Sequence, residues 1–120
     1  MSLDKEQLFR KFGEGLLDDR LSKAIAKLGY IHPTLIQAKM IPIALRGRDV
    51  LARARTGSGK TFAYAIPVLQ KILKVKTRTT SGDRKVRAVV LVPSKELCHQ
   101  TLAAFQQLSY YMSNMVTMCE

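Results

Sequence analysis

Apolar residues recur every three or four positions in the first part of the chain, a spacing that places them on one face of a helix. Leu17, Leu21, Ile25 and Leu28 form the first such series, and Gly29 directly after it supplies a helix stop. The sequence therefore predicts an amphipathic helix that ends at Gly29. The residues before this series show no firm periodicity.

A second helical segment is predicted to begin near Thr34. Its apolar positions are Ile36, Met40 and Ile43. Pro42 lies inside the segment and is expected to break or bend it, because proline lacks an N–H and clashes with the preceding turn. Gly47 is expected to end the helix. Pro67, inside a later predicted helix, is expected to cause a kink or an irregular turn for the same reason.

Three short stretches have the composition of β-strands, and helical stretches separate them. Residues 49–53 and 115–118 are strand candidates, and residues 88–92 form a continuous β-branched run that suits a buried parallel strand. The helices between them are predicted over residues 62–73 and 94–108. The apolar positions of these two helices are Phe62, Ile66, Leu69, Ile72, Leu73, Leu97, Leu102 and Phe105. This β-α-β-α-β order predicts an α/β fold, a parallel sheet with helices on both faces.

The connection between the first predicted strand and its helix carries the most specific pattern of the chain. Its residues are Ala54, Arg55, Thr56, Gly57, Ser58, Gly59, Lys60 and Thr61. They match the phosphate-binding pattern G-x-x-x-x-G-K-[ST], with Ala54 in place of the first glycine. A flexible turn beside an exposed lysine is the plain alternative. The order of strand, glycine-rich loop and helix favours the phosphate site.

Each part of this loop suits a nucleoside triphosphate held with Mg²⁺. Gly57 and Gly59 lack a Cβ, so the backbone can take up a positive φ and approach a phosphate closely. Backbone N–H groups at the start of the next helix attract anions. Lys60 is expected to reach the β- and γ-phosphate oxygens, and the Thr61 hydroxyl is expected to ligate Mg²⁺. These two residues are the predicted catalytic pair.

Charge adds a second ligand class. Lys and Arg number 20 against 9 Asp and Glu, which gives a net charge of +11 and favours a polyanion such as nucleic acid. No apolar run approaches the roughly 18 residues of a membrane span, and no secretory signal opens the chain. Cys98 and Cys119 lack zinc-like spacing and are interpreted as reduced thiols of an intracellular protein.

Further segments around the phosphate loop resemble the motifs of DEAD-box RNA helicases. Residues 29–37, Gly-Tyr-Ile-His-Pro-Thr-Leu-Ile-Gln, are similar to the Q motif, and Phe12 lies seventeen residues earlier, where that family has an isolated aromatic. Residues 93–98 with Gln100 resemble motif Ia, P-T-R-E-L-A-x-Q, with Ser and Lys in place of Thr and Arg. The resemblance runs from about Phe12 to the end of the chain. It implies an ATP-dependent RNA helicase with a RecA-like P-loop fold.

The resemblance assigns ATP binding to the phosphate loop together with Phe12, Pro33, Thr34 and Gln37. The Gln37 side chain has one acceptor and two donors, so it can pair bidentately with adenine and discriminate against guanine. Phe12 would stack on the adenine ring, although packing is an equally good reading. Tyr30 is interpreted as structural.

Motif Ia lies where the strand over residues 88–92 ends and a helix begins. The residues assigned to RNA binding are Pro93, Ser94, Lys95 and Glu96. Backbone N–H groups, the Ser94 hydroxyl and Lys95 could hold RNA phosphates without reading bases. Replacing arginine by Lys95 keeps the charge but loses the bidentate fork. Glu96 has a plain alternative role as a first-turn acid that favours the helix dipole.

The resulting domain organisation is an N-terminal extension over residues 1–11, a Q-motif helical region over residues 12–47 and a partial RecA-like ATP-binding domain over residues 48–120. The chain contains no Asp-Glu-Ala-Asp, the motif that in this class holds Mg²⁺ and positions water. These residues alone are therefore expected not to hydrolyse ATP at a useful rate or to unwind RNA. An exposed sheet edge is also expected to weaken the fold.

Residues 33–37 and 51–57 resemble one nucleolar subgroup associated with assembly of the large ribosomal subunit. That resemblance implies a nuclear, nucleolar protein that acts on RNA in pre-ribosomal particles. It also implies a monomer with no membrane partner. Two alternatives stay open. One is an unrelated P-loop ATPase, and the other is a truncated RNA-binding or interaction module that does not turn over ATP.

Overall fold

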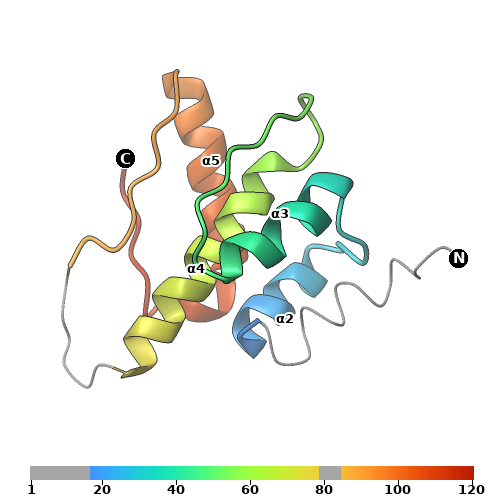
Figure 1. Ribbon diagram of the computed structural model, residues 1–120. Coiled ribbons are helices and arrows are strands. Elements are labelled where there is room, and N and C mark those ends of the chain that lie inside the picture. The colour runs from blue at the N-terminus through green and yellow to red at the C-terminus, as the bar shows by residue number, and fades with distance from the viewer. Residues whose placement is uncertain (1–16, 79–84) are drawn as a thin grey trace, which may run out of the picture.

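Four α-helices and one short 3₁₀ helix make up the regular structure of the described residues, 17–78 and 85–120, in a computed structural model (Figure 1). The elements are α2 (Asp19–Lys27), α3 (Leu35–Leu45), α4 (Lys60–Arg78), α5 (Lys95–Leu108) and the 3₁₀ helix η1 (Tyr110–Met112). Within these residues no helix is long and apolar enough to cross a membrane.

A single apolar core lies around α4, which packs against α2, α3 and α5. The predicted apolar face of α4 is confirmed, since Ile66, Leu69 and Leu73 are almost fully buried. The core members are Leu17, Leu21, Ile25, Ile41, Ala65, Ile66, Leu69, Leu73, Phe105, Leu108 and Met112. α4 continues without a break through Pro67. The first residue of this long central helix, Lys60, belongs to the phosphate loop, so the helix connects the loop with the core.

Helix α2 ends as its sequence predicts, and its start has a side-chain cap. Asp18 is the N-cap and accepts a hydrogen bond from the Arg20 backbone N–H at 3.0 Å, while Gly29 follows the helix with φ of +80°. The Asp18 backbone N–H also donates to Gln70 Oε1 of α4 at 2.6 Å. The cap therefore fixes the start of α2 and attaches it to the central helix.

The Asp18 carboxylate makes the stability of this region depend on pH. The Arg20 guanidinium donates to both of its oxygens, at 2.8 Å each, and this hydrogen bonding holds the pKa of Asp18 below its usual value. A carboxyl with a lowered folded-state pKa stabilises the fold above its unfolded pKa, and the contribution disappears as pH falls through the folded value. We expect Asp18→Ala to lower the free energy of unfolding at pH 7 by about 1 kcal/mol.

Urea unfolding followed by circular dichroism between pH 7 and pH 3 would measure this effect. The difference between wild type and Asp18→Ala should shrink below about pH 4, where the carboxyl becomes protonated in the unfolded chain. Asp19→Ala, one residue further along at an exposed position, is the matched control and should change stability less. A difference that stays constant down to pH 3 would contradict the role of the charged cap.

Of the expectations for α3, a break at Pro42 and an apolar face that includes Ile43 are wrong. The helix runs from Leu35 to Leu45 through Pro42, so the proline neither ends nor interrupts it. The buried positions are Gln37 and Ile41, whereas Ile43, which was expected on the apolar face, is 41% exposed. The orientation of α3 is set by Gln37, whose side chain hydrogen-bonds to the phosphate loop. With Gln37 facing the loop, Ile43 faces solvent.

The three predicted strands do not form a sheet in the described residues. Residues 49–53, 88–92 and 116–118 form no helix and take part in no β-ladder, and Met115 lies in a turn closed by its N–H on the Met112 carbonyl at 2.9 Å. Extended backbone becomes a strand only when a neighbour lies roughly 4.8 Å away to share its hydrogen bonds. Without that pairing their side chains stay open to solvent, and Leu51 and Leu91 are 102% and 90% exposed. Their composition therefore did not determine whether these segments pair.

Candidate nucleotide-binding site

The phosphate loop has the backbone that its glycines predict. Gly57 and Gly59 have φ of +81° and +84°, values that side-chain-bearing residues rarely adopt. A turn closes where the Ser58 N–H donates to the Arg55 carbonyl at 3.2 Å, and α4 begins as the Ala63 N–H donates to the Gly59 carbonyl at 3.1 Å. The first N–H groups of α4 thus directly follow the loop, as an anion site requires.

The Lys60 side chain turns back over the loop. Its Nζ donates to the Ala54 carbonyl at 2.7 Å, and the residue is exposed. The ammonium is therefore held beside the loop by a solvent-exposed hydrogen bond. Lys60 can exchange this bond at little cost for a bond to a stronger acceptor such as a phosphate oxygen. Thr61, the predicted Mg²⁺ ligand, follows it and is half-buried.

Gln37 joins the start of α3 to the phosphate loop. Its Oε1 accepts from the Thr34 N–H at 3.0 Å, and the Thr34 hydroxyl accepts from the Gln37 N–H at 3.4 Å, which together form a capping box. Its Nε2 donates to the Gly59 carbonyl at 3.1 Å. The side chain is 4% exposed and satisfied at both ends. It therefore holds two predicted parts of the site, 22 residues apart, in contact.

Gly59 is required by its neighbours as well as by its φ. A Cβ built on it would lie 2.5 Å from Gln37 Nε2 and 3.1 Å from the Thr34 side chain. A Cβ on Gly57 would meet nothing within 4 Å. Only at Gly59, therefore, does the loop approach the Q-motif segment so closely that no side chain fits between them.

The remaining predicted nucleotide-site residues differ in exposure. Pro33 is buried, Ser58 is half-buried, and Arg55 and Thr56 are exposed. Phe12 lies outside the described residues. Ser58 Oγ is buried and has no hydrogen-bond partner in the described part of the chain. An unsatisfied hydroxyl in a loop with two positive-φ glycines fits a site built for an anionic ligand such as the phosphates of ATP.

One contact at this site was not predicted as functional. The Tyr30 and Phe62 rings pack edge to face with centroids 5.1 Å apart, which ties the Q-motif segment to the first turn of α4. Tyr30 is 48% exposed, and its contact agrees with a structural role. The apolar spacing of α4 flagged Phe62 as a core residue, but no pattern in the sequence indicated its partner.

The predicted RNA-binding residues lie at the start of α5. Ser94 is the N-cap, and its Oγ accepts from the Leu97 N–H at 3.2 Å. Pro93, Ser94, Lys95 and Glu96 are all exposed. Figure 1 shows the start of α5 at the same end of the molecule as the phosphate loop. The two predicted sites therefore share one end of the helical layer.

Comparison with known proteins decides the family. Residues 34–120 match the family described as DEAD/DEAH box helicase. The chain belongs to the DEAD/DEAH box helicase family. The matched region begins at the N-cap Thr34 and includes Gln37, the phosphate loop and the start of α5. The family resemblance inferred from the motifs is thereby confirmed.

Relatives and a solved structure support this membership. The chain is 47% identical over 118 residues to "Probable ATP-dependent RNA helicase ddx56" of Dictyostelium discoideum, covering 98% of this chain and 16% of that protein. It is 46% identical over 104 residues to "ATP-dependent RNA helicase DBP9" of Cryptococcus neoformans, covering 84% of this chain and 17% of that protein. This DEAD/DEAH box chain thus spans about a sixth of the length of these relatives.

The fold class is confirmed by a solved helicase. The crystal structure of the RNA helicase Prp28 from Chaetomium thermophilum bound to ADP superposes with a TM-score of 0.70 at 33% identity. The match covers 83% of this chain and 24% of that one. The helices and extended segments of this DEAD/DEAH box chain therefore have the arrangement of part of a RecA-like helicase, even though no β-ladder links the described segments.

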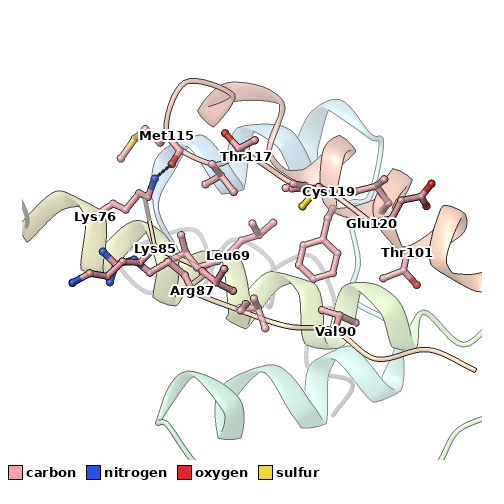
Figure 2. Close-up of a pocket in the computed structure, with 18 of the residues that line it drawn as sticks. Leu69, Lys76, Lys85, Arg87, Val90, Thr101, Met115, Thr117, Cys119 and Glu120 are labelled. Atoms are coloured by element: carbon pink, nitrogen blue, oxygen red, sulfur yellow. Dashed lines mark hydrogen bonds between the residues drawn. The ribbon is translucent and has the colours of Figure 1, made fainter. Parts of the chain in front are cut away.

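A pocket of about 920 Å³ lies elsewhere in the molecule, between α4, α5 and the extended segments 85–92 and 114–120 (Figure 2). Leu69 belongs to its mainly apolar lining, and at one edge the Lys76 ammonium donates to the Met115 carbonyl. None of the predicted site residues in the described ranges lines it. Because it lies between the helices and the segments expected to form the sheet, it belongs to the interior of the helicase fold.

The cysteines sit near this pocket. Both are free thiols, and desolvation together with the Glu120 carboxylate raises the pKa of Cys98. Glu120 Oε2 also lies 3.0 Å from His99 Nδ1. The described residues contain no group of three potential metal ligands. Cys98 is therefore a protonated thiol near neutral pH, since the ordinary thiol pKa is already about 8.5.

Proposed function

We propose that this chain is the ATP-binding part of an ATP-dependent RNA helicase. The observation that carries the proposal is the hydrogen bond from Gln37 Nε2 to the Gly59 carbonyl. It places a side chain suited to reading adenine directly against the loop suited to holding phosphates. A base and a triphosphate belonging to one ligand could therefore be recognised together.

Each residue of the site has a distinct task in this proposal. The Lys60 ammonium would exchange its bond to the Ala54 carbonyl for bonds to phosphate oxygens. The N–H groups at the start of α4 would hold the same phosphates. The Thr61 hydroxyl would hold Mg²⁺, which when bound neutralises charge on the phosphates. Gln37 would exchange internal hydrogen bonds for bonds to the adenine edge.

RNA binding is proposed at the start of α5. The Ser94 hydroxyl oxygen already accepts from the Leu97 N–H, so its proton remains to donate to a phosphate. Lys95 is exposed beside it and supplies a positive charge. Contacts of this kind hold the backbone and carry no base information, which suits an enzyme that acts on many sequences.

The wider role of the protein is proposed from similarity. The matched relatives are named ATP-dependent RNA helicases, and residues 51–57 resemble the nucleolar subgroup. We therefore include ribosome biogenesis, action on pre-ribosomal particles, a nucleolar location and a monomeric state in the proposal. A second candidate is an RNA-binding module without turnover, because the 120 residues contain no Asp-Glu-Ala-Asp. Reading the coding sequence beyond Glu120 separates the two, because an in-frame Asp-Glu-x-Asp would supply the missing acidic residues and a stop codon would not.

Gln37→Glu tests the observation that carries the proposal. The carboxylate can still accept from the Thr34 N–H and complete the capping box, but it has no donor for the Gly59 carbonyl or for adenine. We expect ATP affinity, measured by calorimetry, to fall about tenfold or more, which corresponds to roughly 1.4 kcal/mol. The preference for ATP over GTP should fall with it.

The matched control is Gln107→Glu, at an exposed position of α5, which makes the same chemical change away from the site. It should leave both nucleotide affinities unchanged. An unaltered preference for ATP in Gln37→Glu would contradict the reading of adenine by this side chain and would favour an unrelated P-loop ATPase.

A further inference from the structure

Two neighbouring tyrosines of η1 and two lysines of α2 form an exposed patch. We call this set, Lys23 and Lys27 of α2 with Tyr110 and Tyr111 of η1, the tyrosine–lysine patch. Tyr110 and Tyr111 are 57% and 43% exposed. Their rings meet edge to face with centroids 5.0 Å apart. The proposed nucleotide and RNA sites use none of these residues.

The patch is held in place by the core beneath it. η1 packs on α2, and Met112, the third residue of η1, is fully buried. The Met112 N–H donates to the carbonyl of the buried Ser109 at 2.9 Å. Because Met112 and Ser109 point inward, the two tyrosines between them are left on the surface. The rings are thus presented on a fixed turn and need little ordering when a ligand binds.

Lysine ammonium groups lie directly beside the rings. Lys27 Nζ is 3.3 Å from the Tyr110 ring centroid and 5.8 Å from that of Tyr111, a cation–π arrangement. Lys23 precedes Lys27 by four residues and therefore lies on the same face of α2. Neither lysine forms an ion pair with a carboxylate of the described chain. The positive charge of the patch is thus available to an anionic partner.

The chemistry of the patch fits unpaired nucleotides. Every base has a π-face that stacks on aromatic side chains, and such stacking is found where basic groups track the phosphates. The net charge of +11 draws polyanions to the whole chain.

The patch is separate from the proposed RNA site at the start of α5. α5 has 14 residues and is therefore about 21 Å long, and η1 follows its far end (Figure 1). We propose that the tyrosine–lysine patch is a second contact for single-stranded RNA, in which bases stack on Tyr110 and Tyr111 while Lys23 and Lys27 meet the phosphates. This contact needs no ATP.

The test is binding of a fluorescein-labelled oligoadenylate of about ten nucleotides, within the site sizes of single-strand-binding proteins, measured by anisotropy without nucleotide. Tyr110→Leu with Tyr111→Leu keeps apolar bulk and removes the aromatic faces, so we expect roughly tenfold weaker binding. Tyr110→Phe with Tyr111→Phe should keep wild-type affinity. Binding of a duplex of equal length should be the same in all three proteins.

Lysine variants distinguish a specific RNA contact at the patch from nonspecific attraction by the net positive charge. Lys27→Ala should weaken binding more than Lys71→Ala, which removes one charge from an exposed position of α4. The chain has four tyrosines and no tryptophan, so oligoadenylate should quench the tyrosine fluorescence of the wild type. In the double phenylalanine variant, that quenching should decrease although binding is retained.

Three outcomes would overturn the inference. The first is equal RNA affinity of the double leucine variant and wild type, and the second is an equal loss of RNA affinity in Lys27→Ala and Lys71→Ala. The third is that a glutamate-rich peptide binds wild type more tightly than the double leucine variant, while RNA binds both proteins equally. The last result would assign the patch to an acidic protein partner. All these RNA-binding measurements are made without nucleotide, so they do not depend on whether Lys60→Ala loses ATP binding. The proposed helicase function and this second contact can therefore fail separately.

Discussion

In a protein that joins this chain to the Asp-Glu-Ala-Asp motif absent from the 120 residues, replacing Lys60 by alanine is expected to abolish RNA-stimulated ATP turnover. It should also weaken ATP binding by roughly ten- to a hundredfold, because a hydrogen bond to a charged group contributes about 1.5–3 kcal/mol. Among the described residues the ammonium bonds only to the Ala54 carbonyl, at an exposed position, so its loss should cost the fold little. Calorimetry with ATP measures binding, and phosphate release with and without RNA measures turnover.

Lys71→Ala is the matched control for Lys60→Ala, since it removes one positive charge from an exposed position of the same helix. It should leave ATP affinity within error of wild type. RNA binding without nucleotide should stay mostly intact in both variants. Turnover near the wild-type rate in Lys60→Ala would end the assignment of this residue to the phosphates.

Gly59→Ala and Gly57→Ala should differ although both glycines have nearly the same φ. Each substitution forces alanine into the left-handed region, at a cost of roughly 1–2 kcal/mol. Only at Gly59 does the new Cβ also meet Gln37 Nε2, at 2.5 Å. Because Gln37 is buried and bonded to Thr34, it must give up its contact with the loop. We expect Gly59→Ala to weaken ATP binding by a hundredfold or more.

The comparison of the two alanine variants isolates the contact between Gln37 and the loop. Gly57→Ala pays the same backbone strain in open space and should retain more ATP affinity than Gly59→Ala. Combining Gln37→Ala with Gly59→Ala should recover part of the loss, since the smaller side chain removes the clash. Equal affinities in the two single variants would show that backbone strain alone decides the behaviour of the loop.

The sequence predicted helices well and pairings poorly. The period of Leu17, Leu21 and Ile25 located α2 because one buried face determines a helix by itself. Residues 88–92 had the composition of a strand, but a strand is completed by a neighbour whose position no local pattern encodes. Pro42 was expected to break or bend α3, yet the helix continues through it, because the packing of α3 on α4 outweighs the loss of one hydrogen bond.

For the candidate site, the sequence predicted the glycine conformations of the loop but not the contacts between the loop and α3. The phosphate loop and its positive-φ glycines could be read from spacing alone. The bond from Gln37 to the Gly59 carbonyl could not, because it links residues 22 positions apart through the packing of α3 on α4. The same packing explains why the polar Gln37 is buried while the apolar Ile43 is exposed.

The extended segment 85–92 also determines how the protein should be handled in solution. Val86, Val89 and Leu91 are 84%, 75% and 90% exposed, and extended backbone with exposed apolar side chains is a surface on which copies of a chain can pair. The net charge of +11 keeps copies apart, but this repulsion reaches roughly 10 Å at 0.1 M salt and only about 3 Å at 1 M. Ionic strength therefore controls the balance between dispersed molecules and edge-to-edge association.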